Sequence, residues 1–280
     1  MIPYGRQDIS QEDIDAIVEV LRSDFLTQGP KVPAFESALT SYTGAKHALA
    51  VNSATSALHI ACMALDLGEG DWLWTSPITF VASANAALYC GAKVDFVDID
   101  SRTYNLCPYK LEKKLEIANL NDCLPKILVP VHLSGQSCDM KRIKELCDKY
   151  DIKILEDASH AIGGSYQGEP IGGCKYSDIT VFSFHPVKIV TTAEGGAALT
   201  NDYKLATKMA LYRSHGITRD LDEMTEVEHG PWYYQQITLG YNYRMTELQA
   251  ALGISQMVRL TEFVSTRHKI AERYNSLLQD

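Results

Sequence analysis

The chain has 280 residues, 46% of them hydrophobic, which is enough to bury the core of one large domain, or of one domain plus part of a second. Its formal net charge is -9, and no run of Lys and Arg is longer than two residues, as at Lys113-Lys114. This distribution of charge argues against nucleic acid or an anionic membrane as a partner.

The cysteine pattern argues against a domain stabilised by disulfides and against one stabilised by zinc. There are seven of them, an odd number, and no pair has the C-x-x-C spacing, so they match neither a disulfide framework nor a zinc site, and we expect no metal. Residues 1–6 lack the basic and then apolar pattern of a secretory signal, and no apolar stretch reaches membrane-spanning length. We therefore expect a cytoplasmic protein with reduced thiols.

The first 44 residues predict two helices that form an N-terminal arm. Ser10 is a typical N-cap, and the acidic residues Glu12 and Asp13 favour the first turn of a helix whose apolar face continues to Leu21. The second helix is predicted to start near Pro30 and to end at Gly44.

Beyond this arm, short apolar runs alternate with segments of helical period. The predicted strands are residues 48–51, 72–75, 94–97, 127–131, 152–155, 179–184 and 197–200, and the predicted helices between them include 55–67, 82–90, 109–117, 140–150 and 203–212. This order predicts an α/β fold with a mainly parallel sheet and helices on both faces. In such sheets ligands bind at the carboxyl ends of the strands.

The remaining part of the chain is less regular. Residues 219–236 are first acidic and then aromatic, which predicts a long surface loop. Residues 246–280 predict one or two helices with no closing strand after them.

Small polar residues follow the first predicted strand. Residues 52–57 read Asn-Ser-Ala-Thr-Ser-Ala and open a helix, and free backbone amides at a helix N-terminus suit a phosphate. The segment is not a Walker loop, because it has no Gly-Lys-Ser/Thr. Plain helix capping by small hydroxyl residues is the alternative interpretation.

Two later strand ends carry residues that suit a planar, nitrogen-containing ring. Phe80 follows the strand 72–75 and can stack on such a ring, although a phenylalanine there is also typical of ordinary core. Asp157 and His160 follow the strand 152–155. A carboxylate at this edge can keep a pyridine nitrogen protonated, which makes the ring an electron sink. The alternative is an Asp N-cap with His160 on a helix surface.

Lys188 follows the apolar run 179–184, which predicts a buried strand. An ammonium in a desolvated pocket has a lowered pKa, so part of the population is the neutral amine that can form an imine with an aldehyde cofactor. A solvated lysine that caps the strand is the alternative.

The conjunction of these segments decides between the alternatives. A phosphate cradle, a ring stacker, a carboxylate for a ring nitrogen and a lysine occur in that order, nearly all at predicted strand-to-helix junctions. Asn242, in the polar and aromatic turn 240–244, is a further candidate phosphate donor, or else part of a helix-entry turn. The phosphate cradle, the ring stacker, the carboxylate and the lysine together predict one site for pyridoxal phosphate.

With these segments in view, the chain resembles the sugar aminotransferases, a family of fold-type-I pyridoxal-phosphate enzymes that act on nucleotide-linked keto sugars. The resemblance runs from about residue 3 to residue 275. The matching segments are residues 26–29, 35–36, 52–58, 79–82, 96–99, 130–133, 156–158, 183–188, 194–196 and 240–244. The resemblance implies the large domain of that fold type, with its mainly parallel sheet between helices.

The resemblance also implies a role for each cofactor residue. Lys188 is the catalytic lysine that holds the cofactor as an imine, Asp157 pairs with the pyridine nitrogen, and His160 lies against the ring. Phe80 stacks on the ring face. The phosphate is held by the small residues Ala54, Thr55 and Ser183.

Partners follow from the same resemblance. Asn242 reaches the cofactor phosphate of the neighbouring subunit, which implies a homodimer with shared active sites. The UDP-sugar faces residues near the N-terminus, namely Tyr4, Asp24, Phe25, Leu26 and Thr27.

Within the family, residues 52–58, 77–85, 159–161 and 191–194 are most similar to the branch that acts in pseudaminic acid biosynthesis. The implied reaction transfers an amino group from an amino acid, with L-glutamate expected, to the C4 ketone of a UDP-linked 4-keto-6-deoxy N-acetylhexosamine. The branch that makes UDP-4-amino-4-deoxy-L-arabinose shares the S-F-H-x-x-K pattern and stays open, as do other nucleotide-sugar aminotransferases.

Members of the family continue into a smaller C-terminal domain. We expect residues 1–245 to form the cofactor-binding large domain, and residues 246–280 to form helices that lead toward a small domain absent from this chain. A cofactor-binding fragment without catalysis is therefore an open alternative of another class. A sugar dehydratase is disfavoured, because dehydratase relatives carry a histidine in place of Lys188.

Overall fold

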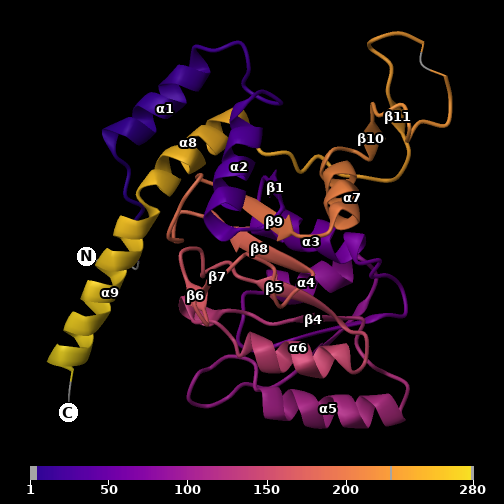
Figure 1. Ribbon diagram of the computed structural model, residues 1–280, viewed down its shortest axis with the longest axis vertical. Coiled ribbons are helices and arrows are strands. Elements are labelled where there is room, and N and C mark those ends of the chain that lie inside the picture. The colour runs from indigo at the N-terminus through magenta and orange to yellow at the C-terminus, as the bar shows by residue number, and fades with distance from the viewer. Residues whose placement is uncertain (1–4, 228, 279–280) are drawn as a thin grey trace.

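A seven-stranded sheet forms the centre of the computed structural model, which describes residues 5–227 and 229–278 (Figure 1). The order across the sheet is β1 (His47–Val51), β9 (Gly196–Thr200), β8 (Ile179–Ser183), β5 (Lys153–Asp157), β4 (Ile127–Val129), β2 (Trp72–Thr75) and β3 (Lys93–Phe96). Only β9 runs antiparallel to its neighbours, β1 and β8. The prediction of a mainly parallel sheet is confirmed.

The helices lie close to their predicted positions. They are α1 (Gln11–Leu21), α2 (Lys31–Thr43), α3 (Ala54–Ala64), α4 (Ala82–Tyr89), α5 (Pro108–Leu120), the 3₁₀ turn η1 (Leu133–Gly135), α6 (Met140–Asp148), α7 (Tyr203–Arg213), α8 (Glu247–Val258) and α9 (Leu260–Leu277). None of the helices in the described part of the chain is long and apolar enough to cross a membrane.

Two short hairpins lie outside the central sheet. Strands β6 (Ser165–Tyr166) and β7 (Glu169–Pro170) form one, and β10 (Ile217–Thr218) pairs with β11 (Gln235–Gln236) in the other. Most of the predicted loop 219–236 lies between the two strands of this second hairpin, and its residues 219–227 and 229–234 extend away from the sheet (Figure 1), whereas residues 235–236 form β11.

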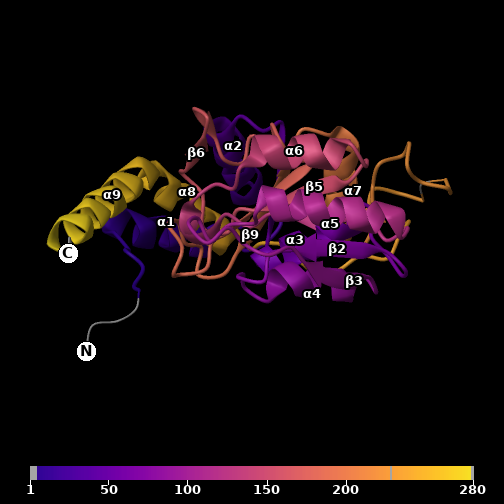
Figure 2. The ribbon, with the colours of Figure 1, turned by 90° about the horizontal axis from the view of Figure 1, so that it is seen from below.

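Alternation along the central strands builds a core on each face of the sheet. In β5, Leu155 packs with α3 and α4 in one core, while its neighbour Ile154 packs with α5 and α6 in the other. Figure 2 shows α5 and α6 on one side of the strands and α3 and α4 on the opposite side. Because successive side chains of a strand point to opposite faces, helices are required on both faces.

The N-terminal arm is attached to α8 through a buried carboxylate. Ser10 caps α1 with a reciprocal capping box to Asp13, as the sequence predicts. The same Asp13 side chain accepts hydrogen bonds of 2.6 Å from Ser255 Oγ, Gln256 Nε2 and Arg259 Nη2. A charge can stay buried only when it is paired in this way, so the arm is fixed against the body of the domain.

Turns, not helices, follow two of the strands that carry predicted site residues. After β5 and after β8 the chain forms tight turns, and only β1 and β2 lead into helices, α3 and α4, that carry site residues at or near their first turns. The expectation that nearly all site segments stand at strand-to-helix junctions is therefore wrong for Asp157 and Lys188. A turn lets both side chains lie close above the strand end.

Gly196 allows the start of β9 to lie against the first turn of α3. A Cβ atom at this position would come within 2.4 Å of the Ala54 nitrogen and 2.5 Å of the Ser53 carbonyl carbon. Real Cβ atoms do not approach backbone this closely, so any larger residue would push the N-terminus of α3 outward.

We predict that Gly196→Ala lowers the free energy of unfolding by about 1–3 kcal/mol, because the methyl group overpacks the contact with α3. Urea unfolding of the purified protein measures the change. Gly68→Ala is the matched control, since a Cβ there meets nothing within 4 Å. Equal stability of the two variants would contradict the close approach.

Candidate active site

The carboxyl ends of five strands surround a cavity of about 440 Å³. The segments that follow β1, β2, β4, β5 and β8 all contribute to its wall. The structure brings together here the following residues predicted for the cofactor: Ala54, Thr55, Phe80, Asp157, His160, Ser183 and Lys188. Residues separated by more than 130 positions in the sequence thus meet in one cavity.

Lys188 lies half-buried in the turn after β8, where its backbone N–H donates to the His185 carbonyl at 2.9 Å. Burial lowers the pKa of its amine, and the negative charge of Asp157 opposes this effect. The net direction is downward, so the neutral, nucleophilic amine is more populated than on a surface lysine.

Asp157 is buried at the end of β5, and both of its oxygens are held. Ser83 Oγ, in α4, donates to Oδ2 at 2.6 Å, and the Ser159 backbone N–H donates to Oδ1 at 3.2 Å. Thr79 Oγ1 lies 2.7 Å from Ser83 Oγ and extends this chain. The carboxylate is therefore fixed in direction before any ligand arrives.

His160 and Phe80 bound the cavity in different ways. The Ser134 backbone N–H donates to His160 Nδ1 at 3.2 Å, which places the imidazole proton on Nε2. Burial and the nearby Lys188 charge lower the pKa of His160, while Asp157 opposes them, so the ring is neutral near pH 7. Phe80 is 72% exposed at the edge of the cavity.

The N-terminus of α3 provides the anion-binding end of the cavity. Ser53 caps the helix by accepting from the Ser56 backbone N–H at 3.1 Å, and Ala54 and Thr55 line the cavity in its first turn. The first amides of a helix have no intrahelical acceptor and carry a partial positive charge. Ser183, at the end of β8, adds a buried hydroxyl to the wall.

Other predicted residues lie outside the cavity of this chain. Asn242 is exposed, and its segment pairs with residues 212–215. Asp24, Phe25, Leu26 and Thr27 are exposed beside the start of α8, where the Glu247 backbone N–H donates to the Leu26 carbonyl at 3.1 Å. Tyr4 lies outside the described residues.

The structure also shows polar residues to which the sequence analysis gave no role. Ser83 orients Asp157, and His132 lines the cavity while remaining fully buried. The sequence contains a pattern that could have identified each residue. Ser83 lies four positions after Thr79, at helical spacing, and His132 directly follows an apolar strand. Within residues 5–227 and 229–278, no group of His, Cys, Asp or Glu is arranged to bind a metal, and all seven cysteines are free.

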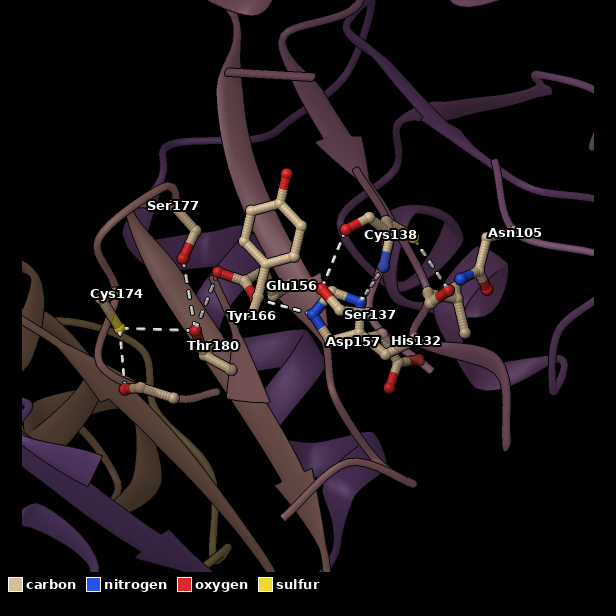
Figure 3. A network of polar contacts seen from close by, with 12 residues as sticks. Asn105, His132, Ser137, Cys138, Glu156, Asp157, Tyr166, Cys174, Ser177 and Thr180 are labelled. Carbon is tan, nitrogen blue, oxygen red and sulfur yellow. Dashed lines mark hydrogen bonds and ion pairs between the residues drawn. The ribbon is translucent and has the colours of Figure 1, made fainter. Parts of the chain in front are cut away.

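Behind the cavity, His132 pairs with Glu156 (Figure 3). The Cys138 backbone N–H donates to His132 Nδ1 at 3.3 Å, so the proton resides on Nε2, which lies 2.7 Å from Glu156 Oε2. Thr180 Oγ1 donates to the other carboxylate oxygen at 3.4 Å. Because Glu156 and Asp157 are successive residues of β5, their side chains leave the strand on opposite faces.

A family model described as the DegT/DnrJ/EryC1/StrS aminotransferase family matches residues 7–280. The chain belongs to this family. It is a pyridoxal-phosphate-dependent aminotransferase, as the sequence predicts, and its fold is that of the solved members.

Similar proteins from three bacteria support this membership. The chain is 45% identical over 275 residues to the UDP-4-amino-4,6-dideoxy-N-acetyl-beta-L-altrosamine transaminase of Campylobacter jejuni strain 81-176, covering 98% of this chain and 69% of that protein. PseC of Helicobacter pylori, an aminotransferase of pseudaminic acid biosynthesis, superposes with a TM-score of 0.89 at 36% identity, over 99% of this chain and 71% of that one. The PLP-form of Spr1654, a proposed sugar aminotransferase from Streptococcus pneumoniae, superposes with a TM-score of 0.85 at 30% identity, over 98% of this chain and 71% of that one.

We predict that Lys188 of the cofactor-free protein reacts with pyridoxal phosphate with a half-maximal pH below 10.5, the ordinary lysine value, because burial lowers its pKa. In Asp157→Asn the profile moves to still lower pH, since the charge that raises this pKa is removed. Stopped-flow absorbance against pH, with Lys188→Ala as the blank, measures both. Asp151→Asn, an exposed aspartate paired with Lys153, should leave the profile in place; an Asp157→Asn profile shifted upward would refute the assignment.

A second prediction concerns the buried pair of His132 and Glu156. His132→Ala leaves the Glu156 carboxylate buried with Thr180 as its remaining partner, so we expect a loss of about 3–5 kcal/mol in the free energy of unfolding. The double variant His132→Leu/Glu156→Leu should regain most of it, because no charge remains buried. Chemical denaturation of the three proteins decides; a double variant no more stable than His132→Ala would count against the pair.

Proposed function

We propose that this enzyme transfers an amino group from L-glutamate to the C4 ketone of a UDP-linked 4-keto-6-deoxy N-acetylhexosamine, a step of pseudaminic acid biosynthesis. The observation that carries this proposal is the identity to the altrosamine transaminase of Campylobacter jejuni over nearly the whole chain. The likeness to PseC of Helicobacter pylori supports the same substrate class.

The chemistry of the cavity residues suits the cofactor. Lys188 supplies an amine with a lowered pKa, Asp157 supplies a fixed carboxylate, and the start of α3 supplies amides for a phosphate. Pyridoxal phosphate, when bound, supplies an aldehyde that bonds amines covalently and a ring that withdraws electrons from the attached carbon. We assign the aldehyde to Lys188, the ring nitrogen to Asp157, the ring faces to Phe80 and His160, and the phosphate to Ala54, Thr55 and Ser183.

Lys188 then acts twice as a proton carrier. With the donor amino acid in the site, the Lys188 Nζ would take the proton from its α carbon. With the sugar bound, the same Nζ would deliver a proton to C4 and so fix its configuration. The lowered pKa of Lys188 suits both steps. A group that acts first as a base and then as an acid works best when its pKa lies near the working pH.

Asp157 contributes a negative charge beside the cofactor ring, and His160 contributes no positive charge. Asp157 would direct its negative charge at the ring nitrogen and so favour the protonated form of the ring. His160 stays neutral, so it adds no positive charge that would oppose the protonated ring. Ser83 and Ser159 hold Asp157 in this direction.

The predicted site residues that lie outside the cavity are assigned to the partner subunit's site or to the UDP-sugar. Asn242 is exposed on its own chain, and we propose that it donates to the cofactor phosphate of the partner subunit. Asp24, Phe25, Leu26 and Thr27 are exposed beside α8 and are proposed to contact the UDP-sugar, together with Tyr4. Residues 1–245 are proposed as the cofactor-binding domain, with 246–280 leading away from it, in a cytoplasmic enzyme.

An absorbance titration tests the reaction and its substrate together. With bound cofactor, L-glutamate should bleach the band of the lysine-bound form, and UDP-4-keto-6-deoxy-N-acetyl-altrosamine should restore it. Lys188→Ala should lack both the band and turnover, because the covalent bond and the proton carrier are lost. A panel with UDP-4-keto-arabinose identifies the arabinose branch if that sugar restores the band faster. A band that glutamate leaves unchanged would reject the aminotransferase reaction for this chain and support a cofactor-binding role.

A further inference from the structure

Asn52 connects the start of α3 to the segment that carries Asn242. It lies between β1 and the N-cap of α3, and its Oδ1 accepts from Ser56 Oγ at 2.7 Å. Its backbone N–H donates to the Tyr243 carbonyl at 2.8 Å, and its Nδ2 lies 3.4 Å from the Asn242 carbonyl. One residue therefore contacts both the anion-binding turn of this chain and the backbone around Asn242.

Two tyrosines hold the same segment from the side. Tyr241 and Tyr243 stack with ring centres 4.9 Å apart and planes at 14°. His59 of α3, 4% exposed, packs against both rings, and its Nδ1 lies 3.2 Å from the Tyr243 hydroxyl. In an extended segment, alternate side chains share a face, so anchoring 241 and 243 on α3 turns the intervening Asn242 side chain the other way.

The residues after α7 also hold the segment. The backbone N–H groups of Tyr241 and Tyr243 donate to the carbonyls of Tyr212 and Arg213 at 2.7 and 3.0 Å. The main chain around Asn242 is thus fixed by bonds to two parts of the fold, while its side chain remains exposed. Such fixation reduces the entropy that a donor loses when it binds a ligand.

We propose that Asn52, with His59 and Tyr243, is a positioning residue that couples the two active sites of the dimer: it holds this subunit's phosphate-binding turn and presents Asn242 to the partner's site. The inference rests on the proposed function, in which Asn242 completes the partner's phosphate site. The coupling is physical, because the helix that holds one phosphate carries the anchors of the residue that reaches the other.

Heterodimers with two affinity tags separate the effects within and between subunits. In each, one subunit keeps Lys188 and reports the absorbance of lysine-bound cofactor, while the other carries Lys188→Ala and is silent. Asn52→Ala is placed either in the reporting subunit or in the silent one, and cofactor release is followed after dilution. Release is read without turnover, and the unfolding midpoint of every heterodimer is recorded.

We expect Asn52→Ala in the silent subunit to speed release from the reporting one about two- to tenfold, the effect of a lost hydrogen bond. Ser53→Ala removes a capping hydrogen bond of α3 but leaves Asn52, His59 and Tyr243 in place, so it should speed release more from the reporting subunit than across the interface. Tyr243→Phe, which removes the bond to His59, should act like Asn52→Ala and serves if that variant does not fold. If Asn52→Ala and Tyr243→Phe speed release only when they are placed in the reporting subunit, the coupling is overturned.

Asn242→Ala in the silent subunit distinguishes the two levels of the proposal. If it speeds release and Asn52→Ala and Tyr243→Phe do not, the shared site stands and the coupling alone is wrong. If no heterodimer forms, or Asn242→Ala has no effect across the interface, the shared site fails and the coupling falls with it.

Discussion

The opposition between the buried Asp157 carboxylate and the Lys188 amine is the interaction on which the site depends. Burial alone would lower the pKa of Lys188, and the carboxylate limits that shift. Ser83 and Ser159 hydrogen bond to the two oxygens of this carboxylate and so satisfy it in the interior. Helix α4 and the turn after β5 therefore contribute to the proposed chemistry, although neither carries Lys188.

The sheet makes this arrangement possible by separating two charges along one strand. Asp157 points toward the cavity, and Glu156, its neighbour in β5, points to the opposite face and pairs with His132 (Figure 3). Each carboxylate thus has its own partners and its own environment. A strand is suited to this task, since its side chains alternate between faces over a rise of about 3.3 Å per residue.

Close packing connects the first turn of α3 to the segment of Asn242. Gly196 lets β9 touch the first turn of α3, and Asn52 joins that turn to the segment of Asn242. Displacement of α3 would therefore disturb the phosphate site of its own subunit and, in the proposed dimer, that of the partner. This arrangement gives a physical route by which occupancy of one site can influence the other.

The sequence by itself determined the element order, the sheet type and the residues with the right chemistry. These follow from local signals: the period of apolar residues gives strands such as β2, and the small residues after β1 mark the start of α3. Only the tertiary structure decided that β9 runs antiparallel, that Ser83 orients Asp157, and that turns follow β5 and β8. Such facts depend on contacts between residues far apart in the sequence, which no local pattern encodes.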